Sequence, residues 1–330
     1  MTMSVAWREE TTQIGEVLRQ SEKVLILEHE KPDGDSIGAG LGLALGMLFL
    51  GKNAILLSQD PHPSTYDFLP GRHLHIVVSD MKSEYGPFDA VVFLDCADRA
   101  RAGAAVEFAK GDIVINIDHH VTNSMFGDIN LVDPGASSTS ELVFYLLKTM
   151  QVPITRNIAI CLYTGIISDT GAFRYENTTS RTFAVASHLV DAGADPSRIA
   201  NQLYECRTAS FLLLLGKALQ TLSLHHDGKV ASVEITREMI RDAGSSFQET
   251  DGIVDYPRSI EGVEVALCFK ERPDGIGVDV SFRSKCRVDV SKIAEALGGG
   301  GHPRAAGATI TGSMEEAKDK VFSLLSKEQI

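Results

Sequence analysis

Short apolar runs rich in valine and isoleucine alternate with helix-like segments through the first half of the chain. The runs are KVLILEH (residues 23–29), NAILLS (53–58), HIVVSD (75–80), AVVFLDCA (90–97) and DIVINIDHH (112–120). Strands that are buried on both faces have this composition. We therefore predict a parallel α/β sheet, with a long apolar helix from about residue 35 to residue 52 after the first strand.

A second strand and helix series follows a helical middle segment. From about residue 138 the sequence becomes helical, and Ser138 and Glu141 have the spacing of a capping box. New strands are expected near KVASVEI (229–235), VEVALCFK (263–270) and IGVDVSFRS (276–284). The 330 residues suffice for two domains. The predicted organisation is an N-terminal domain over 1–190, a helical linker over 191–228 and a smaller α/β domain over 229–330.

The composition argues against long nucleic acids and against a secreted or membrane protein. The formal net charge is −13, whereas proteins that hold long duplexes usually present a basic surface. The five cysteines contain no CxxC pair, so we expect neither a disulfide framework nor a zinc knuckle, and a cytoplasmic location. The N-terminus does not resemble a targeting peptide, and the longest apolar run (residues 41–51) is too short to span a bilayer.

Side chains that bind metals gather where the predicted segments end. In HEKPDGDS, Pro32 and Gly34 force a turn after the first strand. That turn would hold three potential ligands around one point, namely His29, Asp33 and Asp35. Further candidates at later strand ends are Asp95, Asp118, His119, His120 and Asp169. Ligands of open α/β sheets bind at the carboxyl ends of the strands, so these side chains are expected to meet.

Several buried carboxylates in one place need a counter-charge, because unpaired acids repel one another and are costly to bury. A pair of divalent metal ions is the economical explanation. Carboxylates with a few imidazoles suit Mg²⁺ or Mn²⁺, and the nitrogen ligands favour Mn²⁺.

These residues resemble the motifs of the DHH phosphoesterase superfamily. HxxxDxD at 29–35, Asp95, DHH at 118–120 and Asp169 look like its four motifs. Near the C-terminus, SFRS (281–284) and GGGGHPRAAG (298–307) resemble the signature of the DHHA1 domain. The resemblance covers nearly the whole chain. By length and layout it is strongest to the stand-alone nanoRNase/pAp-phosphatase group, with the cyclic-dinucleotide phosphodiesterases beside it.

The resemblance implies a role for each residue of the N-terminal cluster. One ion would be held by His29, Asp33 and Asp95. The other would be held by Asp35, Asp95, His119 and Asp169. In this family His120 faces the substrate phosphate, and Asp118 would orient the cluster. Two ions about 3.5–4 Å apart can share a hydroxide that attacks phosphorus.

The resemblance also implies a substrate clamp on the second domain. Arg283 and His302 lie within the DHHA1-like motifs, and a glycine run lets backbone N–H groups approach an anion closely. The predicted substrate-binding residues are Arg99, Arg283, Ser284, Gly299, Gly300, Gly301, His302 and Arg304. A reaction centre on one domain and a clamp on the other imply a cleft between them, which favours short, end-bound substrates.

The expected function is a metal-dependent phosphodiesterase or exonuclease that degrades very short single-stranded oligonucleotides. 3′,5′-Bisphosphorylated adenosine (pAp) is a further candidate substrate. Cleavage of cyclic di-AMP, or of a linear dinucleotide such as pApA or pGpG, is the alternative within the same chemistry. A family II inorganic pyrophosphatase shares the first motifs, but the GGGGHPRAAG stretch argues against it. A nucleotide-binding sensor without turnover would be expected to lack a metal ligand, and no ligand position is missing. Because family members are commonly dimers, a homodimer is expected.

Overall fold

The computed structural model describes residues 7–82 and 85–326, and the chain separates into two compact units, residues 1–206 and 207–330. The division falls inside the segment predicted as a helical linker. The part of that segment up to Cys206 groups with the first unit, and the rest groups with the second. The predicted domain limits and the cleft between the domains stay predictions.

Parallel strands form the sheet of the first unit, in the order β3-β2-β1-β4-β5-β6. The strands are β1 (Lys23–Leu27), β2 (Asn53–Ser58), β3 (His75–Val77), β4 (Phe88–Leu94), β5 (Gly111–Asp118) and β6 (Ile129–Val132). The α-helices are α1 (Arg8–Gln20), α2 (Gly34–Phe49), α3 (Thr139–Thr149), α4 (Arg156–Asp169), α5 (Ser180–Asp191) and α6 (Pro196–Ala200). The shorter helical turns are η2 (Ser64–Tyr66), η3 (Arg72–Leu74), η4 (Val78–Asp80), η6 (Arg99–Phe108) and η7 (Asn201–Glu205). The predicted parallel α/β sheet is confirmed.

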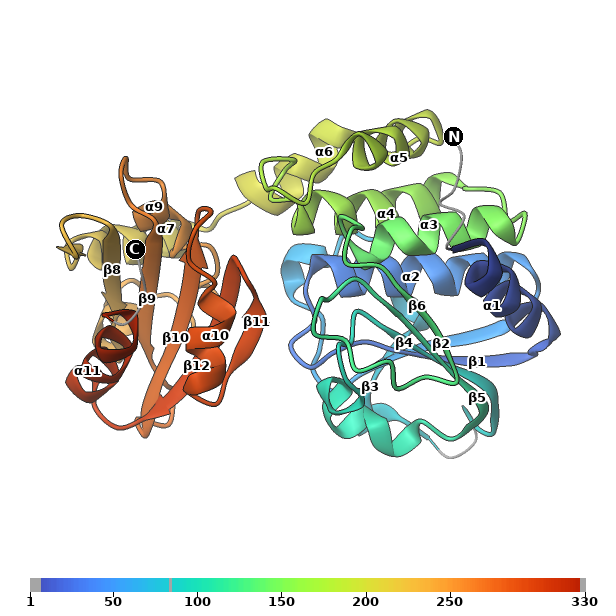
Figure 1. Ribbon diagram of the computed structural model, residues 1–330, viewed down its shortest axis with the longest axis horizontal. Helices are drawn as coiled ribbons and strands as arrows, with labels where there is room; N and C mark the ends of the chain where they lie inside the picture. Colours follow the sequence, from blue (N-terminus) through green and yellow to red (C-terminus); the bar gives the residue numbers. More distant parts are fainter. Residues whose placement is uncertain (1–6, 83–84, 327–330) are drawn as a thin grey trace. The chain divides into compact units, whose positions relative to one another are not determined.

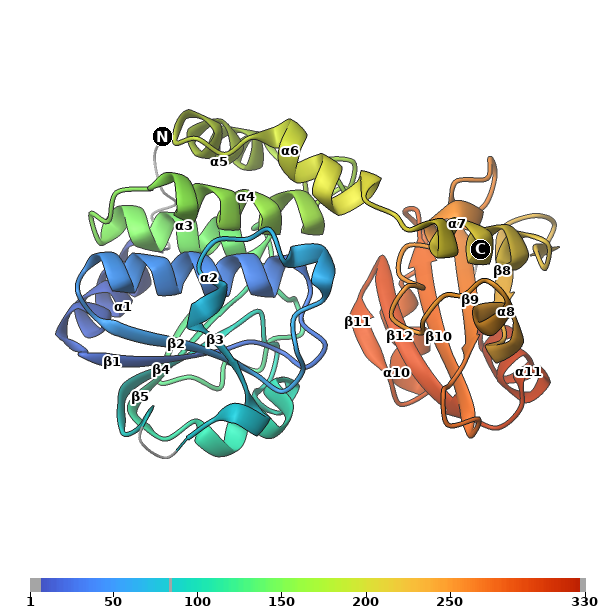
Figure 2. The ribbon, with the colours of Figure 1, turned by 180° about the vertical axis from the view of Figure 1, so that it is seen from behind.

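Both faces of this sheet are buried, which explains the continuous apolar runs of its strands. Ile26, Leu56 and Val92 pack in the cluster on the side of α2, α3 and α4. Leu25, Leu57 and Phe93 pack with alanines of η6 on the other side. Figures 1 and 2 show α2 next to the sheet, with α3 and α4 forming a further layer above it. The central strands β1 and β4 therefore do not need the alternation of apolar and polar residues that an exposed face requires.

The strand register brings the ends of the central strands to one edge. Leu27 of β1 pairs with Phe93 of β4, and Leu94 of β4 pairs with Ile117 of β5. The chain crosses from β3 back to β4, so β1 and β4 flank the point where the strand order reverses. Segments that leave the carboxyl ends of strands at such a point form the usual ligand site of an open α/β sheet.

The second unit contains a mixed sheet in the order β11-β12-β10-β9-β8-β7, in which β8 and β9 are parallel and the other pairs are antiparallel. Its strands are β7 (Ser223–His225), β8 (Val230–Ile235), β9 (Val265–Glu271), β10 (Gly277–Ser284), β11 (Gly300–His302) and β12 (Ala305–Thr311). Its helices are α7 (Ala209–Leu219), α8 (Arg237–Asp242), α9 (Asp255–Arg258), α10 (Val290–Ala296) and α11 (Met314–Leu325). The strands predicted near residues 229–235, 263–270 and 276–284 are confirmed.

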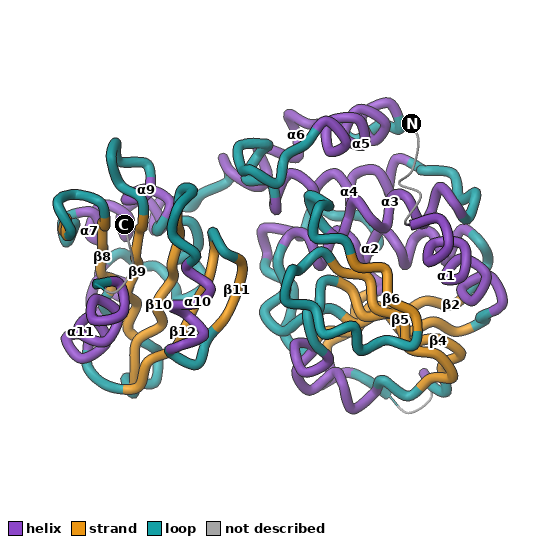
Figure 3. The backbone as a smooth tube through the Cα atoms, viewed as in Figure 1, coloured by secondary structure: helices purple, strands orange, loops and turns teal. Residues whose placement is uncertain are grey.

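Helices cover the two faces of this second sheet unequally. Apolar residues of α10 and α11 pack against β9, β10 and β12 on one face. On the other face α7 and α9 pack mainly on β8 and β9 (Figures 1 and 3), and Ile240 of α8 joins the same apolar cluster. On that second face β10 and β12 carry the half-buried Ser281 and Arg283 and the exposed Gly307 and Thr309. This part of the face is therefore accessible to a ligand of the second unit.

A buried carboxylate organises the turn after β10. Glu264 is 8% exposed, and its Oε1 accepts hydrogen bonds from the backbone N–H groups of Cys286 (3.0 Å), Arg287 and Val288 (3.1 Å). Burial alone would raise the pKa of Glu264, but these backbone donors outweigh it and hold the pKa below its usual value. The charged carboxylate therefore stabilises the folded turn.

Replacing Glu264 with glutamine is expected to destabilise this turn by about 1–2 kcal/mol at neutral pH. The lowered folded pKa means that the carboxylate's contribution is present above the unfolded pKa, about 4.3, and is lost as pH falls through the folded pKa. Hydrogen exchange of the backbone N–H groups of residues 286–288 measures this effect. The variant should exchange faster than wild type at pH 7, and the difference should shrink at pH about 3.5. Glu261→Gln, at an exposed position nearby, is the control; a difference that does not depend on pH would contradict the argument.

Candidate metal centre

The turn after β1 is fixed by its own aspartate. Asp33 is the N-cap of α2, and its Oδ1 accepts hydrogen bonds from the backbone N–H groups of Asp35 (3.0 Å) and Ser36 (3.1 Å). Ser36 Oγ accepts a hydrogen bond from the backbone N–H of Asp33 (3.2 Å), which completes a capping box. The short turn therefore holds Asp33 at the start of α2. Of the three residues that the sequence HEKPDGDS was predicted to hold around one point, His29 and Asp33 belong to one group of potential ligands and Asp35 to another.

The first group of potential ligands lies where β1 and β4 end. His29 Nε2 is 3.7 Å from Asp33 Oδ1 and 3.6 Å from Asp95 Oδ2. His29 Nδ1 lies 2.8 Å from the carbonyl oxygen of Glu30, which fixes the ring so that Nε2 faces the carboxylates. These three residues have the spacing of a metal site.

The second group shares Asp95 with the first. His119 Nε2 is 3.5 Å from Asp95 Oδ1, 3.6 Å from Asp169 Oδ2 and 3.9 Å from Asp35 Oδ2. The two oxygens of Asp95 thus face different groups, Oδ2 toward His29 and Oδ1 toward His119. A carboxylate placed in this way can bridge two metal ions.

Asp95 adopts a backbone conformation that non-glycine residues rarely adopt. Its φ is 58°, in the left-handed region, directly after β4. Its N–H donates to the carbonyl oxygen of Ile117 (3.0 Å), and its Oδ1 accepts from Thr139 Oγ1 (2.9 Å). Such strained residues cluster at functional sites, where the surrounding structure holds them in place.

Asp169 reaches the cluster from a helix, which corrects the prediction that it lies at a strand end. It is the last residue of α4, and α4 packs closely against α2. Glycines permit this approach, because a Cβ on Gly38 would lie 2.5 Å from the carbonyl oxygen of Cys161 and one on Gly165 would lie 2.8 Å from Asp35 Oδ1. The close packing of the two helices brings Asp169 beside Asp35.

His119 and His120 do different things although they are neighbours. His119 contacts the carboxylates of the second group, whereas His120 Nδ1 lies 2.7 Å from Asp118 Oδ1 and 3.7 Å from Asp95 Oδ1. Asp118 is itself held by Asn123, whose Nδ2 donates to Asp118 Oδ2 (2.6 Å) and to the carbonyl oxygen of Cys96. The structure therefore orients His120 through Asp118.

Several residues that hold these side chains were not predicted from the sequence. Asp35 accepts hydrogen bonds from the backbone N–H groups of Thr139 (2.6 Å) and Ser140 (2.9 Å), at the N-terminus of α3. Asn177 Nδ2 donates to Asp169 Oδ2 (3.2 Å). The predicted helix start at Ser138 was the signal that could have indicated the contact with Asp35. Asn123 and Asn177 lie in loops, and nothing in their sequence context marks them.

The electrostatics of the cluster favour a bound cation. Burial lowers the pKa of His119, but the carboxylates of Asp169, Asp95 and Asp35 outweigh it and raise the pKa to about 10. Burial raises the pKa of Asp169 to about 7, and burial together with Asp95 and Asp169 raises the pKa of Asp35. The carboxylates are thus too close together to be ionised at low cost without positive charge among them.

The donor set fits a pair of divalent ions. Four carboxylates and two imidazoles form two groups that share Asp95, and oxygen with some nitrogen suits Mn²⁺ or Mg²⁺. The side chains that would hold one ion are His29, Asp33 and Asp95, and those that would hold the other are Asp35, Asp95, His119 and Asp169.

The predicted substrate residues are divided between the two units, with Arg99 in the first and the others in the second, and they have different surroundings. Arg99, in η6, is exposed, and it donates to the carbonyl oxygen of Ala109 (3.2 Å). Arg283 lies on the accessible face of β10, whereas Ser284 is 1% exposed and its hydroxyl donates to the carbonyl oxygen of Pro303 (3.2 Å). Arg304 donates to the carbonyl oxygen of Val288 (3.0 Å). The side chain of His302 lies outside what the structure describes. Substrate binding by these residues stays a prediction.

The glycine run of residues 298–301 is only partly open to a ligand. A Cβ on Gly299 would lie 2.1 Å from the carbonyl oxygen of Gly307, and one on Gly301, whose φ is +140°, would lie 2.5 Å from that of Ala305. No described atom lies within 4 Å of the position of a Cβ on Gly300. A Cβ on Gly298 would likewise meet no described atom within 4 Å, so the backbone near Gly298 and near Gly300 is the part of the run that an anion could approach.

Alanine substitutions at Gly299 and Gly300 should separate these structural and binding roles. Gly299→Ala is expected to destabilise the second unit by about 1–3 kcal/mol, because its Cβ collides with β12. Gly300→Ala should change stability by no more than about 0.5 kcal/mol and should raise KM if the substrate approaches there. Urea unfolding followed by far-UV circular dichroism, together with steady-state kinetics, measures both effects. Equal loss of stability in the two variants would contradict this assignment.

The fold and the candidate metal centre agree with a hydrolase of the phosphoesterase class, which the family and the relatives of the chain show. Residues 23–166 match the DHH family, N-terminal domain, and residues 227–328 match the DHHA1 domain. The chain belongs to the DHH family, as its motifs indicated.

Relatives and solved structures agree with this membership. The chain is 36% identical to the bifunctional oligoribonuclease and PAP phosphatase NrnA of Thermus thermophilus, over 96% of this chain and 93% of that protein. It is 31% identical to the cyclic-di-AMP phosphodiesterase GdpP of Bacillus subtilis, over 93% of this chain but only 48% of that protein. The crystal structure of an exopolyphosphatase-related protein from Bacteroides fragilis matches with a TM-score of 0.92 and 27% identity, over 99% of this chain and 98% of that one.

A more distant likeness concerns the fold alone. The crystal structure of the exonuclease RecJ bound to manganese matches with a TM-score of 0.54 and 15% identity, over 98% of this chain and 94% of that one.

Within the part of the chain that the structure describes, none of the helices combines the length and the apolar character that spanning a membrane requires.

Proposed function

We propose that this protein is a metal-dependent phosphodiesterase that hydrolyses very short oligonucleotides to nucleoside monophosphates and also dephosphorylates pAp. One observation carries the proposal: the two oxygens of Asp95 face two separate ligand groups, His29 with Asp33 and His119 with Asp35 and Asp169. This arrangement suits phosphoester hydrolysis assisted by two ions. The activities of the similar Thermus thermophilus protein, an oligoribonuclease and PAP phosphatase, supply the substrate class.

The residues of the chain would have separate roles in the reaction, and those of the ligand groups would hold the ions. Two divalent ions at the ligand groups would lower the pKa of a bound water and neutralise charge that develops on the phosphate. Asp35 is held at the N-terminus of α3 and Asp95 by Thr139, so the carboxylates are in place before substrate arrives. Such preorganisation avoids the cost of moving charged groups during the reaction.

The position of His120 suits the transfer of a proton in the reaction. Asp118 engages its Nδ1, and we assign Nε2 as the atom that meets the substrate. Burial lowers the pKa of His120, but Asp118 and Asp95 outweigh it and raise the pKa, which favours a proton on the ring. We assign to Nε2 the transfer of that proton to the departing oxygen.

The second unit would bind the phosphate and nucleoside parts of the substrate. Arg283 and Ser281 lie on the accessible face of β10, with the exposed Gly307 beside them on β12. The backbone near Gly300 adds N–H groups that an anion can approach. The net charge of −13 agrees with a short substrate, because a long strand would need an extended basic track.

A side-by-side assay tests the substrate proposal. The purified full chain with Mn²⁺ is given linear dinucleotides, an oligonucleotide of about eight residues, cyclic di-AMP and pAp, and kcat/KM is compared. The highest value is expected for the linear dinucleotides, with pAp also hydrolysed. A preference for cyclic di-AMP would replace the oligonucleotide proposal with the alternative activity. Binding of these nucleotides without any turnover would indicate a sensor and overturn the enzyme proposal.

We further propose Mn²⁺ as the working ion, a homodimer as the assembly and the cytoplasm as the location. The imidazole nitrogens of His29 and His119 favour Mn²⁺ over Mg²⁺. Activity after reconstitution with each ion tests the first point, and sedimentation velocity tests the second.

A further inference from the structure

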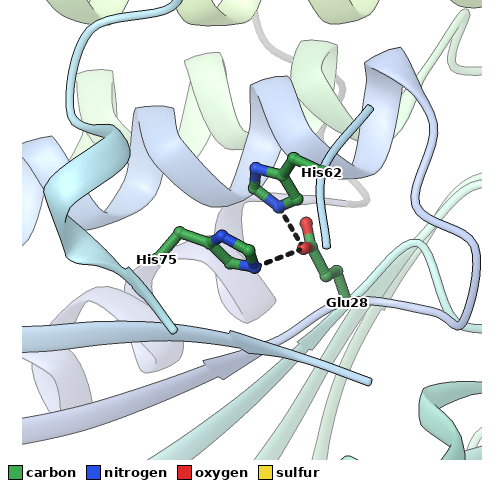
Figure 4. A group of neighbouring side chains, drawn as sticks. All are labelled: Glu28, His62 and His75. Atoms are coloured by element: carbon green, nitrogen blue, oxygen red, sulfur yellow. Dashed lines mark hydrogen bonds and ion pairs between the residues drawn. The ribbon is translucent and has the colours of Figure 1, made fainter. Parts of the chain in front are cut away.

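A second cluster of metal-binding side chains lies in the first unit, outside the candidate metal centre. It consists of Glu28, His62 and His75. Glu28 directly follows β1, His62 lies in the loop after β2, and His75 is the first residue of β3. Figure 4 shows both imidazoles directed at the carboxylate of Glu28.

The geometry of the cluster brings three ligand atoms together. His62 Nε2 contacts Glu28 Oε1, and His75 Nε2 lies 3.8 Å from the same oxygen. One ligand atom from each residue lies within 4.8 Å of the others. The two imidazole rings are stacked, with centroids 3.5 Å apart and planes at 12°. Both Nε2 atoms therefore lie beside the same oxygen, Glu28 Oε1.

The cluster is buried, and its carboxylate is only partly satisfied. The exposed fractions of the side chains are 0% for Glu28, 4% for His62 and 12% for His75. Among the described residues, Glu28 Oε2 has no hydrogen-bond partner. A buried carboxylate oxygen without a partner costs free energy comparable to a lost hydrogen bond, or more, since the group is charged. Some further interaction of Glu28 is thus expected.

A network of hydrogen bonds explains only part of this arrangement. His62 pairs with Glu28 Oε1, and His75 Nε2 lies 2.7 Å from Ser58 Oγ. Neither contact involves Glu28 Oε2. Burial, His62 and Arg72 lower the pKa of His75 to about 3, so its ring is neutral at physiological pH. Neutral imidazole is the form that binds metals.

We propose that Glu28, His62 and His75 bind a divalent ion of the zinc class, separate from the ions of the catalytic centre. Two imidazoles and one carboxylate suit Zn²⁺, and three protein ligands leave a position for water. Tetrahedral ligands of Zn²⁺ lie about 3.3 Å from one another, which is shorter than the 3.8 Å between His75 Nε2 and Glu28 Oε1. To admit the ion, His62 would move away from Glu28, and His75 Nε2 would exchange its contact with Ser58 Oγ for the ion. The ion would connect the end of β1, the start of β3 and the loop after β2. Its ligand Glu28 directly precedes His29 in the chain.

Counting bound ions tests this site. The full chain is stripped of metal, dialysed against micromolar Zn²⁺ and analysed by native mass spectrometry. Wild type is expected to bind one Zn²⁺ more per chain than either His62→Gln or His75→Gln. His73→Gln, which changes an exposed histidine next to the cluster, should bind as many ions as wild type. Equal numbers of bound ions in wild type and in the folded His62 and His75 variants would overturn the proposal.

A crystallographic measurement on the wild-type chain keeps the proposal testable if the variants do not fold. Crystals grown with Zn²⁺ should show an anomalous difference peak at the zinc edge within bonding distance of His62 Nε2, His75 Nε2 and Glu28. Density that shows the hydrogen-bonded cluster and no such peak would overturn the proposal. The result does not depend on the catalytic activity.

Discussion

Replacing Asp95 with asparagine is expected to lower kcat/KM on a linear dinucleotide by about 10³-fold or more. Asp95 is the residue whose two carboxylate oxygens face the two ligand groups, so one substitution weakens both candidate ion sites at once. The loss corresponds to at least about 4 kcal/mol of transition-state stabilisation. Steady-state kinetics in saturating Mn²⁺ measure the effect, and metal analysis of the dialysed variant should show fewer bound ions than wild type.

Asp98→Asn is the matched control for this change. Asp98 lies three residues further along, is exposed and caps η6 through its side chain, a role that asparagine also performs. It should retain kcat/KM within about twofold of wild type. If Asp95→Asn retained wild-type turnover and wild-type metal content, the bridging role of Asp95 and the proposed mechanism would both be wrong.

Replacing His120 with glutamine should lower kcat on a linear dinucleotide by about 10²–10⁴-fold, with a smaller effect on KM. The reason is that His120 is proposed to give a proton to the departing nucleoside oxygen, which is a poor leaving group without it. A p-nitrophenyl phosphodiester needs no such proton, because p-nitrophenolate leaves readily. The variant should therefore lose far less activity on that ester than on the dinucleotide.

The comparison between the two substrates distinguishes proton transfer from other roles of His120. An equal loss on both substrates would contradict proton donation and indicate that the ring stabilises a phosphate oxygen instead. Asn123→Ala provides a further check on the positioning of this histidine, because Asn123 holds Asp118 and Asp118 holds His120. It should produce a smaller loss of the same kind, greater on the dinucleotide than on the ester.

Much of the fold could be predicted from the sequence because strands that are buried on both faces have a recognisable apolar composition. The runs at residues 23–29, 53–58, 75–80, 90–97 and 112–120 each overlap a strand of the parallel sheet. The middle segment was harder to divide. Residues 191–228 are helical for much of their length, but α7 packs Leu214 and Ala218 with Val233 of β8, so it groups with the second unit. Periodicity predicts that a helix has an apolar face and does not predict which sheet that face covers.

The types of ligand in the candidate centre could be predicted from the sequence. How the fold brings these ligands together could not. Carboxylates and imidazoles at the ends of segments predicted a metal-binding cluster, and the structure brings His29, Asp95 and His119 together. The position of Asp169 in the cluster depends on the close packing of α4 against α2. In the sequence, the only sign of this packing is a set of scattered glycines. The residues that hold the cluster, such as Asn123 and Asn177, contact it from loops whose course local sequence does not determine.

The sequence by itself determined the class of fold, the family motifs and the chemistry of the donor atoms, because these depend on local composition and spacing. Only the tertiary structure decided which oxygen of Asp95 faces which group, that Asp118 orients His120, and that His62 and His75 converge on Glu28. Each of these contacts joins residues whose separation is set by strand order and by turns. Contacts of that kind arise when the sheet and its covering helices assemble, and they carry no periodic signal along the chain.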